Sequence, residues 1–221
     1  MNNNIKKMLS NFKRTIIGFF YQASNEKILN DGYIKIKGHL NIEEVDLLRE
    51  SYSFENNDET MKSEPTESRF VFYDLSIFND TVLNNFYVKR ILKNYRPYVS
   101  APSFLMRNII TNTHGLGSGG GWHRDSYTPT LKVFVPLTDC TKANGATILV
   151  NNSYRPWSKL LDFFKGPRLN DDDVTNKKIT TLLLDVGDIA IIDTSCVHRG
   201  SKPFQPGRDM LTLYFSNPDL N

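Results

Sequence analysis

The stretch Trp122-His-Arg-Asp-Ser-Tyr-Thr-Pro-Thr-Leu-Lys-Val-Phe-Val-Pro-Leu137 joins a His-x-Asp pair to a mostly apolar run. The residues from Leu131 to Leu137 predict a buried β-strand. Side chains two residues apart on an extended segment point to the same side, so His123 and Asp125 can both face one interior. On a helix, the same spacing would turn the two side chains apart. The stretch therefore favours a β-fold that carries polar ligands on its inner face.

A second histidine extends this pair to a candidate metal site. His198 follows the apolar run Ile189-Ala-Ile-Ile192, which predicts another strand. Two imidazoles and one carboxylate can cover one face of an octahedral metal and leave the other positions open, as in non-haem Fe(II) oxygenases. A lone histidine is more often a satisfied core or surface residue, but the combination of His123, Asp125 and His198 reverses that expectation. No thiolate accompanies them, which argues against a structural zinc site.

Arg208 is the candidate anchor for a cosubstrate. It lies between His198 and a predicted final strand over 211–215. Its planar guanidinium can bind a carboxylate through two parallel hydrogen bonds, and a metal beside such an anchor indicates a 2-oxoacid, of which 2-oxoglutarate is the commonest. The alternative for Arg208 is a surface salt bridge, which would contribute less than about 1 kcal/mol. Two other histidines are weaker candidates, His114 as an extra ligand and His39 as a loop residue.

Short strands separated by turns predict a mainly β protein with flanking helices (α+β). We expect a double-stranded β-helix, the jelly-roll or cupin-like barrel. The predicted strands are 33–37, 69–73, 104–112, 131–137, 146–150, 180–184, 189–192 and 211–215. The predicted helices are 1–30, 42–50 with Asn41 as its N-cap, 79–96 and 157–164. The polar residues 53–68 predict a mobile loop and 152–178 an irregular insertion, and both are candidate lids.

Length and composition narrow the class of protein. A chain of 221 residues can bury a real core, and we expect a single domain over 1–221 with a helical segment at about 1–30. The net charge of +3 is too small to indicate nucleic-acid binding. No apolar stretch is long enough for a membrane span, and the basic segment 1–22 is expected to pack on the domain, with weak membrane-surface contact as the alternative. Cys140 and Cys196 are expected to be reduced thiols in a cytoplasmic protein.

Several stretches together resemble the phytanoyl-CoA dioxygenase family of Fe(II)/2-oxoglutarate oxygenases. They are Asp31–Gly38, Asn41–Val45, Trp122–Asp125, Leu131–Asp139, Asn144–Ala146, Val186–Asp188 and His198–Ser201, followed by Arg208. The resemblance covers most of the chain and is specific when these stretches are taken together. One stretch departs from the family pattern, since Asn151-Asn-Ser-Tyr-Arg155 stands where members commonly carry Gly-Ser-His. That loop borders the substrate pocket in the family, so the departure leaves the identity of the substrate open.

The resemblance implies a role for each candidate residue. His123, Asp125 and His198 would ligate Fe(II), and Arg208 would hold the far carboxylate of 2-oxoglutarate. Asn112 is a weaker candidate for contact with the near carboxylate. O2 would be the remaining cosubstrate. Related halogenases lack the carboxylate ligand, so the presence of Asp125 indicates hydroxylation.

The substrate implied by the resemblance is a small metabolite, sugar or natural-product intermediate. Two other kinds of function are compatible with the same residues. The barrel could be a non-catalytic module that binds metal and 2-oxoglutarate. It could also be a metal-dependent hydrolase or a cupin-type isomerase, although neither requires an anchor such as Arg208. Turnover of 2-oxoglutarate to succinate would separate an oxygenase from both alternatives.

Overall fold

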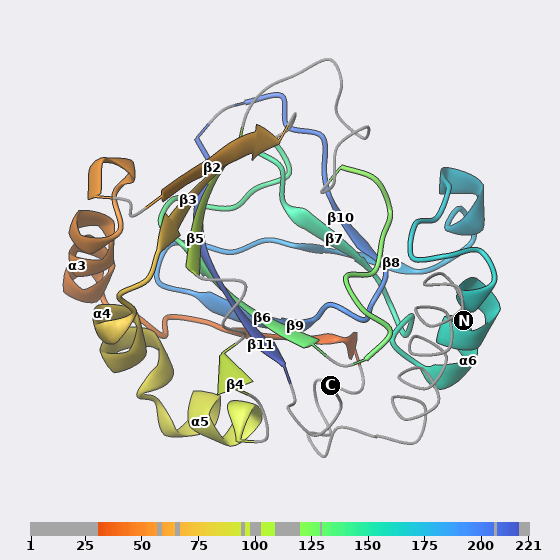
Figure 1. The fold of residues 1–221 in the computed structure, drawn as a ribbon, viewed down its shortest axis with the longest axis horizontal. Coiled ribbons are helices and arrows are strands. Elements are labelled where there is room, and N and C mark those ends of the chain that lie inside the picture. The colour runs from red at the N-terminus through yellow and green to blue at the C-terminus, as the bar shows by residue number, and fades with distance from the viewer. Residues whose placement is uncertain are drawn as a thin grey trace, which may run out of the picture.

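The computed structural model describes residues 31–56, 59–64, 67–93, 96–97, 103–108, 120–128, 130–205 and 207–216. This part of the chain is mainly β, with two antiparallel sheets and flanking helices, and its architecture is the jelly-roll of the double-stranded β-helix type. The α-helices are α3 (Ile42–Ser51), α4 (Ser76–Phe78), α5 (Phe86–Leu92) and α6 (Pro156–Phe163). Figure 1 shows α3, α4 and α5 on one flank of the molecule and α6 on the opposite flank. The helix predicted for residues 1–30 lies outside the described residues.

The larger sheet has eight strands. Its order is β1 (Tyr33–Ile36), β9 (Ile189–Asp193), β6 (Thr130–Pro136), β11 (Asp209–Ser216), β5 (Ser103–Asn108), β3 (Glu67–Phe72) and β2 (Glu59–Glu64), and β4 (Arg96–Pro97) pairs with β11. All pairings are antiparallel, and most of them join strands that are far apart in the sequence. The predicted strands in this sheet are confirmed, except that the strand predicted for 104–112 is described only as far as Asn108.

The smaller sheet consists of β10 (His198–Gly200), β7 (Thr147–Val150) and β8 (Ile179–Leu182) in that order. It confirms the strands predicted for 146–150 and 180–184. A buried apolar cluster joins the two sheets, with Leu149 and Leu182 from the smaller sheet and Phe134, Ile192 and Met210 from the larger one. The inner faces of the sheets are therefore packed against each other.

The outer face of the larger sheet is covered by the helices of one flank. Leu131, Val133 and Val135 alternate with the inward residues of β6 and pack in a second buried cluster. Val45 and Leu48 of α3, Phe78 of α4 and Val88 of α5 belong to the same cluster. Burying one such side chain contributes about 1.5–3 kcal/mol, so this layer is a main source of stability. A sheet with apolar residues on both faces explains why its central strands read as continuous apolar runs.

Helix α3 begins where its cap predicts. Asn41 Oδ1 accepts a hydrogen bond from the amide of Glu44 (2.9 Å), and Glu44 Oε2 accepts one from the amide of Asn41 (2.8 Å). This reciprocal pair satisfies amides that the helix itself leaves without partners. The N-cap prediction at Asn41 is confirmed, and the helix ends within a residue of the predicted Glu50.

The loop predicted for residues 53–68 is wrong over 59–64 and 67–68, which lie in strands. After the short 3-10 turn η1 (Phe54–Asn56), strands β2 and β3 pair as an antiparallel hairpin. Polarity indicated a loop, but β2 is the last strand of its sheet. An edge strand needs no apolar run, and charged residues there discourage pairing with other chains.

The single helix predicted for 79–96 is also wrong. The chain instead forms α4, the π-helical segment η2 (Asn79–Leu83) and then α5. Asn85 separates the last two, because its Oδ1 accepts from the amides of Tyr87 (2.8 Å) and Val88 (3.4 Å) and caps a new helix. The apolar spacing continues across this break, so periodicity alone did not reveal it.

The insertion at 152–178 contains α6, close to the helix predicted for 157–164, and the 3-10 turn η3 (Asp171–Asp173). Cys140 and Cys196 are both free, as predicted, and both are buried. Within the described ranges, no helix has the combined length and apolarity that a bilayer crossing requires.

Replacing Asn41 by Ala tests the cap of α3. We expect the free energy of unfolding in urea to fall by about 1 kcal/mol, because the Glu44 amide loses its acceptor. Asn41→Asp keeps an acceptor oxygen at the same place and should stay close to the wild-type stability. Equal stability of Asn41→Ala and the wild type would contradict the capping role.

Candidate metal centre

A short antiparallel ladder holds His123 beside His198. The amide of His123 donates to the carbonyl of His198 (3.0 Å), and the amide of His198 donates to the carbonyl of His123 (2.8 Å). The amide of Asp125 donates to the carbonyl of Thr194 (3.1 Å) and continues the pairing. The two imidazole centroids lie 4.4 Å apart as a result. Backbone pairing therefore brings together two histidines that are far apart in the sequence.

Each imidazole is oriented by the carbonyl two residues before it. Nδ1 of His123 lies 2.7 Å from the oxygen of Gly121, and Nδ1 of His198 lies 2.9 Å from the oxygen of Cys196. A carbonyl oxygen only accepts, so each Nδ1 carries the proton of that bond. Nε2 of each ring then points away from these carbonyls, which is the orientation typical of metal-bound histidine.

The Nε2 atom of His198 is suited to a cation. Burial lowers the pKa of His198 to about 3, so the ring is neutral at physiological pH. Because its proton is on Nδ1, its Nε2 presents a lone pair. This atom is buried and has no hydrogen-bond partner in the described part of the chain. A buried acceptor without a partner is costly unless a ligand completes it.

Asp125 faces both imidazoles. Its Oδ1 lies 3.4 Å from Nε2 of His123 and 3.8 Å from Nε2 of His198. Its Oδ2 lies 2.7 Å from Nζ of Lys132, and about a quarter of the Asp125 side chain (26%) is exposed. Burial opposes ionisation of Asp125, but the adjacent ammonium of Lys132, together with the contacts that the carboxylate makes with His123 and His198, holds its pKa well below its usual range. The carboxylate is therefore charged at neutral pH.

The three side chains form a compact donor set. One ligand atom from each of His123, Asp125 and His198 lies within 4.8 Å of the others. Two imidazole nitrogens and a carboxylate oxygen suit Fe(II), and the open side of such a set can take exchangeable ligands. The residues present thus fit the metal that the sequence predicts.

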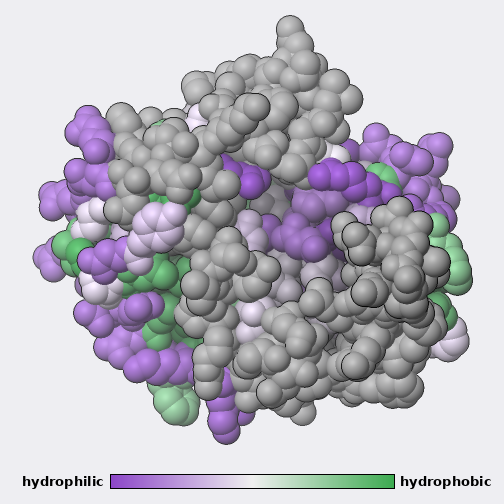
Figure 2. Space-filling view, in the orientation of Figure 1, coloured by the Kyte–Doolittle hydropathy of each residue, from purple (hydrophilic) through white to green (hydrophobic). Residues whose placement is uncertain are grey.

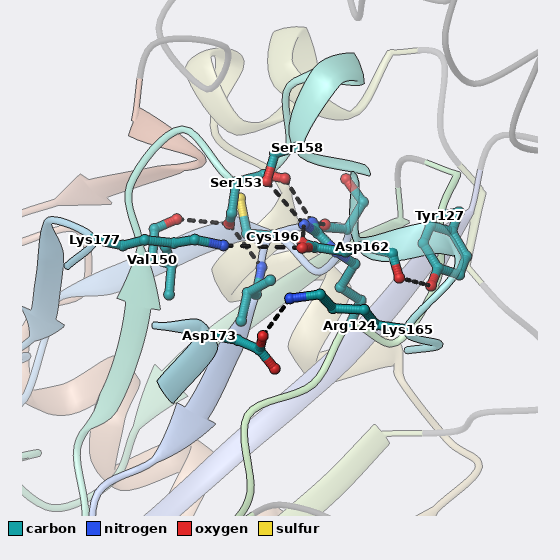
Figure 3. Close-up of polar contacts among 12 residues, drawn as sticks. Arg124, Tyr127, Val150, Ser153, Ser158, Asp162, Lys165, Asp173, Lys177 and Cys196 are labelled. Carbon is teal, nitrogen blue, oxygen red and sulfur yellow. Dashed lines mark hydrogen bonds and ion pairs between the residues drawn. The ribbon is translucent and has the colours of Figure 1, made fainter. Parts of the chain in front are cut away.

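Arg124 lies between two of these residues in the sequence but points the opposite way. Its guanidinium donates to the carbonyls of Ser153 (2.6 Å) and Ser195, to Oγ of Ser158 (3.1 Å) and to Oδ2 of Asp162. Figure 3 shows this guanidinium at the centre of the network, with Ser158 and Asp162 reaching it from α6. Arg124 therefore ties the His123–Asp125 segment to the insertion.

Asp171, in the same insertion, contacts both segments that carry the histidines. Oδ1 of Asp171 accepts hydrogen bonds from Nε1 of Trp122 (2.9 Å) and from Nη1 of Arg199 (2.9 Å). The Arg199 guanidinium also lies 4.2 Å from the ring centroid of Trp122. Trp122 precedes one histidine and Arg199 follows the other. The insertion, predicted to be a lid, thus braces both ligand segments through the residues next to the ligands.

The other predicted site residues have different outcomes. Arg208 is buried just before β11, where its Nη1 donates to the carbonyl of Gly145 next to β7. His198 pairs with Leu149 of β7, whereas Gly145, the partner of Arg208, precedes the start of β7 at Thr147. Asn112 and His114 lie outside the described residues. His39 is a loop residue whose Nε2 contacts the carbonyl of Val82 (3.0 Å), away from the triad.

Lys132 and Arg124 contact the metal centre or support it, and the sequence did not predict either role. Lys132 stands alone as a charge within a strand whose other residues are largely apolar, which was an available signal. Arg124 stands between two predicted ligands and gave no signal beyond its position.

Figure 2 shows a hydrophilic hollow near the middle of this face, in the region where Figure 1 places β7 and β10.

Comparison with known proteins identifies the family of the chain. The sequence model of the family described as phytanoyl-CoA dioxygenase (PhyH) matches residues 28–203. No curated protein matches the sequence significantly.

Several solved structures share the fold. HygX from Streptomyces hygroscopicus, solved with nickel, 2-oxoglutarate and hygromycin B bound, superposes with a TM-score of 0.59 at 14% identity, covering 90% of this chain and 88% of its own. EctD from S. alaskensis, solved with bound Fe, gives 0.62 at 14% identity, covering 90% and 80%. The epimerase SnoN, solved with Fe3+, alpha ketoglutarate and nogalamycin RO, gives 0.59 at 17% identity, covering 86% and 81%.

Removing one imidazole tests the metal centre. We expect His198→Ala to weaken Co(II) binding more than about a hundredfold, since loss of residues that only support a ligand already costs about 10–100-fold. Isothermal titration of the metal-free chain measures this directly. His39→Ala is the matched control and should bind as the wild type does. Unchanged binding by His198→Ala would rule out this residue as a ligand.

The stabilising role of the buried Arg124 network is tested by removing the guanidinium. We expect Arg124→Met to lower the free energy of unfolding by about 3 kcal/mol, because Asp162 is then left buried without its main partner. Chemical denaturation is the measurement. Lys165→Met removes an exposed ion pair with Asp173 and should change stability little. If both variants behaved alike, the buried network would not have the stabilising role assigned to it.

Proposed function

The chain belongs to the phytanoyl-CoA dioxygenase family of non-haem Fe(II)/2-oxoglutarate oxygenases, and we propose that it hydroxylates a small metabolite, sugar or natural-product intermediate. The observation that carries this proposal is the convergence of His123, Asp125 and His198, with a buried Nε2 that lacks a partner in the described chain. These three residues would hold Fe(II). The iron and 2-oxoglutarate would supply O2 activation, with decarboxylation of the cosubstrate to succinate and CO2.

The residues around the centre would prepare and protect that chemistry. The carbonyls of Gly121 and Cys196 keep the imidazoles in the tautomer that presents Nε2. Arg124 and Asp171 keep the two ligand segments in place from behind. The protein would thus contribute fixed geometry, while the hard chemistry belongs to the cofactor.

Arg208 is the proposed anchor for the far carboxylate of 2-oxoglutarate. It is buried, it follows the second histidine, and it lies at the other end of the strand that pairs with β10. Asn112 is retained as a proposed contact to the near carboxylate on the family resemblance alone. The presence of Asp125 supports hydroxylation over halogenation, because the carboxylate would occupy the position that a halide needs.

The cellular setting is a further proposal. Two buried free thiols support a reducing compartment such as the cytoplasm. A small-molecule substrate is supported by the solved structures of similar fold, two of which hold natural products. The turn at Asn151–Arg155 stands where members of the family commonly carry Gly-Ser-His, so the family resemblance does not identify the substrate.

A turnover assay tests the proposal against its main alternative. The Fe(II)-loaded chain should convert 2-oxoglutarate to succinate with O2, slowly alone and faster with a suitable substrate from a panel of sugars, acyl-CoA esters and amino-acid derivatives. A non-catalytic binding module would bind 2-oxoglutarate without forming succinate. A hydrolase or isomerase would act on its substrate with no need for 2-oxoglutarate.

The anchor role of Arg208 is tested in the same assay. We expect Arg208→Ala to raise the KM for 2-oxoglutarate at least about tenfold, because a charge-assisted pair with the carboxylate is lost. Arg208→Lys keeps the positive charge but loses the two-pronged guanidinium. Its KM for 2-oxoglutarate should therefore lie between those of the wild type and Arg208→Ala. Normal cosubstrate affinity in Arg208→Ala would show that the anchor lies elsewhere.

A further inference from the structure

Lys132 is a buried cation within the core of the larger sheet. Only 7% of it is exposed, and it lies on β6 between Leu131 and Val133, which face the helices. By the alternation of a strand, Lys132 shares the inner face with Phe134, which packs between the two sheets. Lysine is almost never fully buried unless it is paired. Its partners should therefore explain its presence.

Two partners hold the ammonium in one place. Nζ lies 2.7 Å from Oδ2 of Asp125 and 4.6 Å from the ring centroid of Tyr214. Tyr214 is the residue directly opposite Lys132 in the pairing of β11 with β6. An ammonium over an aromatic face is attracted by the ring, so Tyr214 restricts where Nζ can lie.

The two carboxylate oxygens of Asp125 face different partners. Oδ1 faces Nε2 of His123 at 3.4 Å and Nε2 of His198 at 3.8 Å. Oδ2 faces Lys132 instead. A carboxylate can bind a metal through one oxygen or both, and here the second oxygen already has a charged partner.

We propose that Lys132 is a positioning residue of the metal centre, whose ammonium holds Oδ2 of Asp125 so that Oδ1 alone is offered to the metal. This role rests on the proposed function, since it presumes that the triad binds a divalent cation. The pair keeps the carboxylate compensated and oriented when no metal is bound. It also leaves a unit positive charge beside the metal, and like charges a few ångströms apart repel strongly in a partly buried site.

The proposal predicts the direction of an unusual effect. Removing the ammonium should tighten binding of a divalent metal, for three reasons that act together. The repulsion disappears, Oδ2 becomes available as a second ligand atom, and the metal-free state loses the charged partner of its partly buried carboxylate. A lysine with a merely structural role would, when replaced, leave metal affinity unchanged or weaken it.

The experiment is a titration of the metal-free chain with Co(II), without cosubstrate. Lys132→Met and Lys132→Gln should lower the Kd for Co(II) at least about tenfold. The Kd of Lys132→Arg should stay near that of the wild type, because the positive charge is kept. The ligand-field absorption of bound Co(II) should also change in the two neutral variants, because the coordination by Asp125 changes. Lys35→Met is the matched control, since Lys35 forms an equally short pair with Asp188 (2.7 Å) away from the triad. That control should match the wild type in both readouts.

The outcomes separate this role from the metal centre itself. If Lys132→Met and Lys132→Gln bound Co(II) as the wild type does, or more weakly, the positioning role would be overturned while the metal site stood. Tighter binding of the same size in Lys35→Met would overturn the positioning role as well. A wild-type chain that bound no Co(II) at all would refute the centre, and with it the role of Lys132.

Discussion

The two backbone hydrogen bonds between His123 and His198 are the interaction on which the remaining geometry depends. They pair the segment that precedes β6 with strand β10, and they place the two imidazoles side by side. The carbonyls of Gly121 and Cys196 then orient the rings, and the next alternate residue, Asp125, completes the donor set. A metal site of this kind needs no dedicated loop, because backbone pairing supplies the convergence.

The residues next to the ligands in the sequence point to the opposite side and contact the insertion. The ligands face the interior, whereas Trp122, Arg124 and Arg199 face outward and meet the 152–178 insertion. Arg124 reaches α6, and Asp171 receives both Trp122 and Arg199. One insertion therefore stabilises both ligand segments without contributing a ligand. This arrangement explains why a long polar insertion is folded against the barrel, and why it carries buried charges such as Asp162.

The sequence was sufficient wherever burial or ligand chemistry dictated the residue type. Central strands were predictable because both of their faces are apolar, and the convergence of His123, Asp125 and His198 was predictable because few residue combinations can form such a donor set. Strand β2 was missed because an edge strand needs only backbone partners. The break at Asn85 was missed because a side-chain cap interrupts a helix without interrupting its apolar spacing. Lys132 and Arg124 depend on which partners the fold brings to them, and that information is spread over β11, α6 and the ligand segment.

Anomalous X-ray diffraction at the iron edge, from crystals of the Fe(II)-loaded chain, would locate the bound metal directly. We expect one anomalous peak within bonding distance of Nε2 of His123, Oδ1 of Asp125 and Nε2 of His198, with Oδ2 of Asp125 still turned to Lys132. A peak bound to other residues, or a well-ordered triad with no peak in iron-saturated crystals, would contradict it.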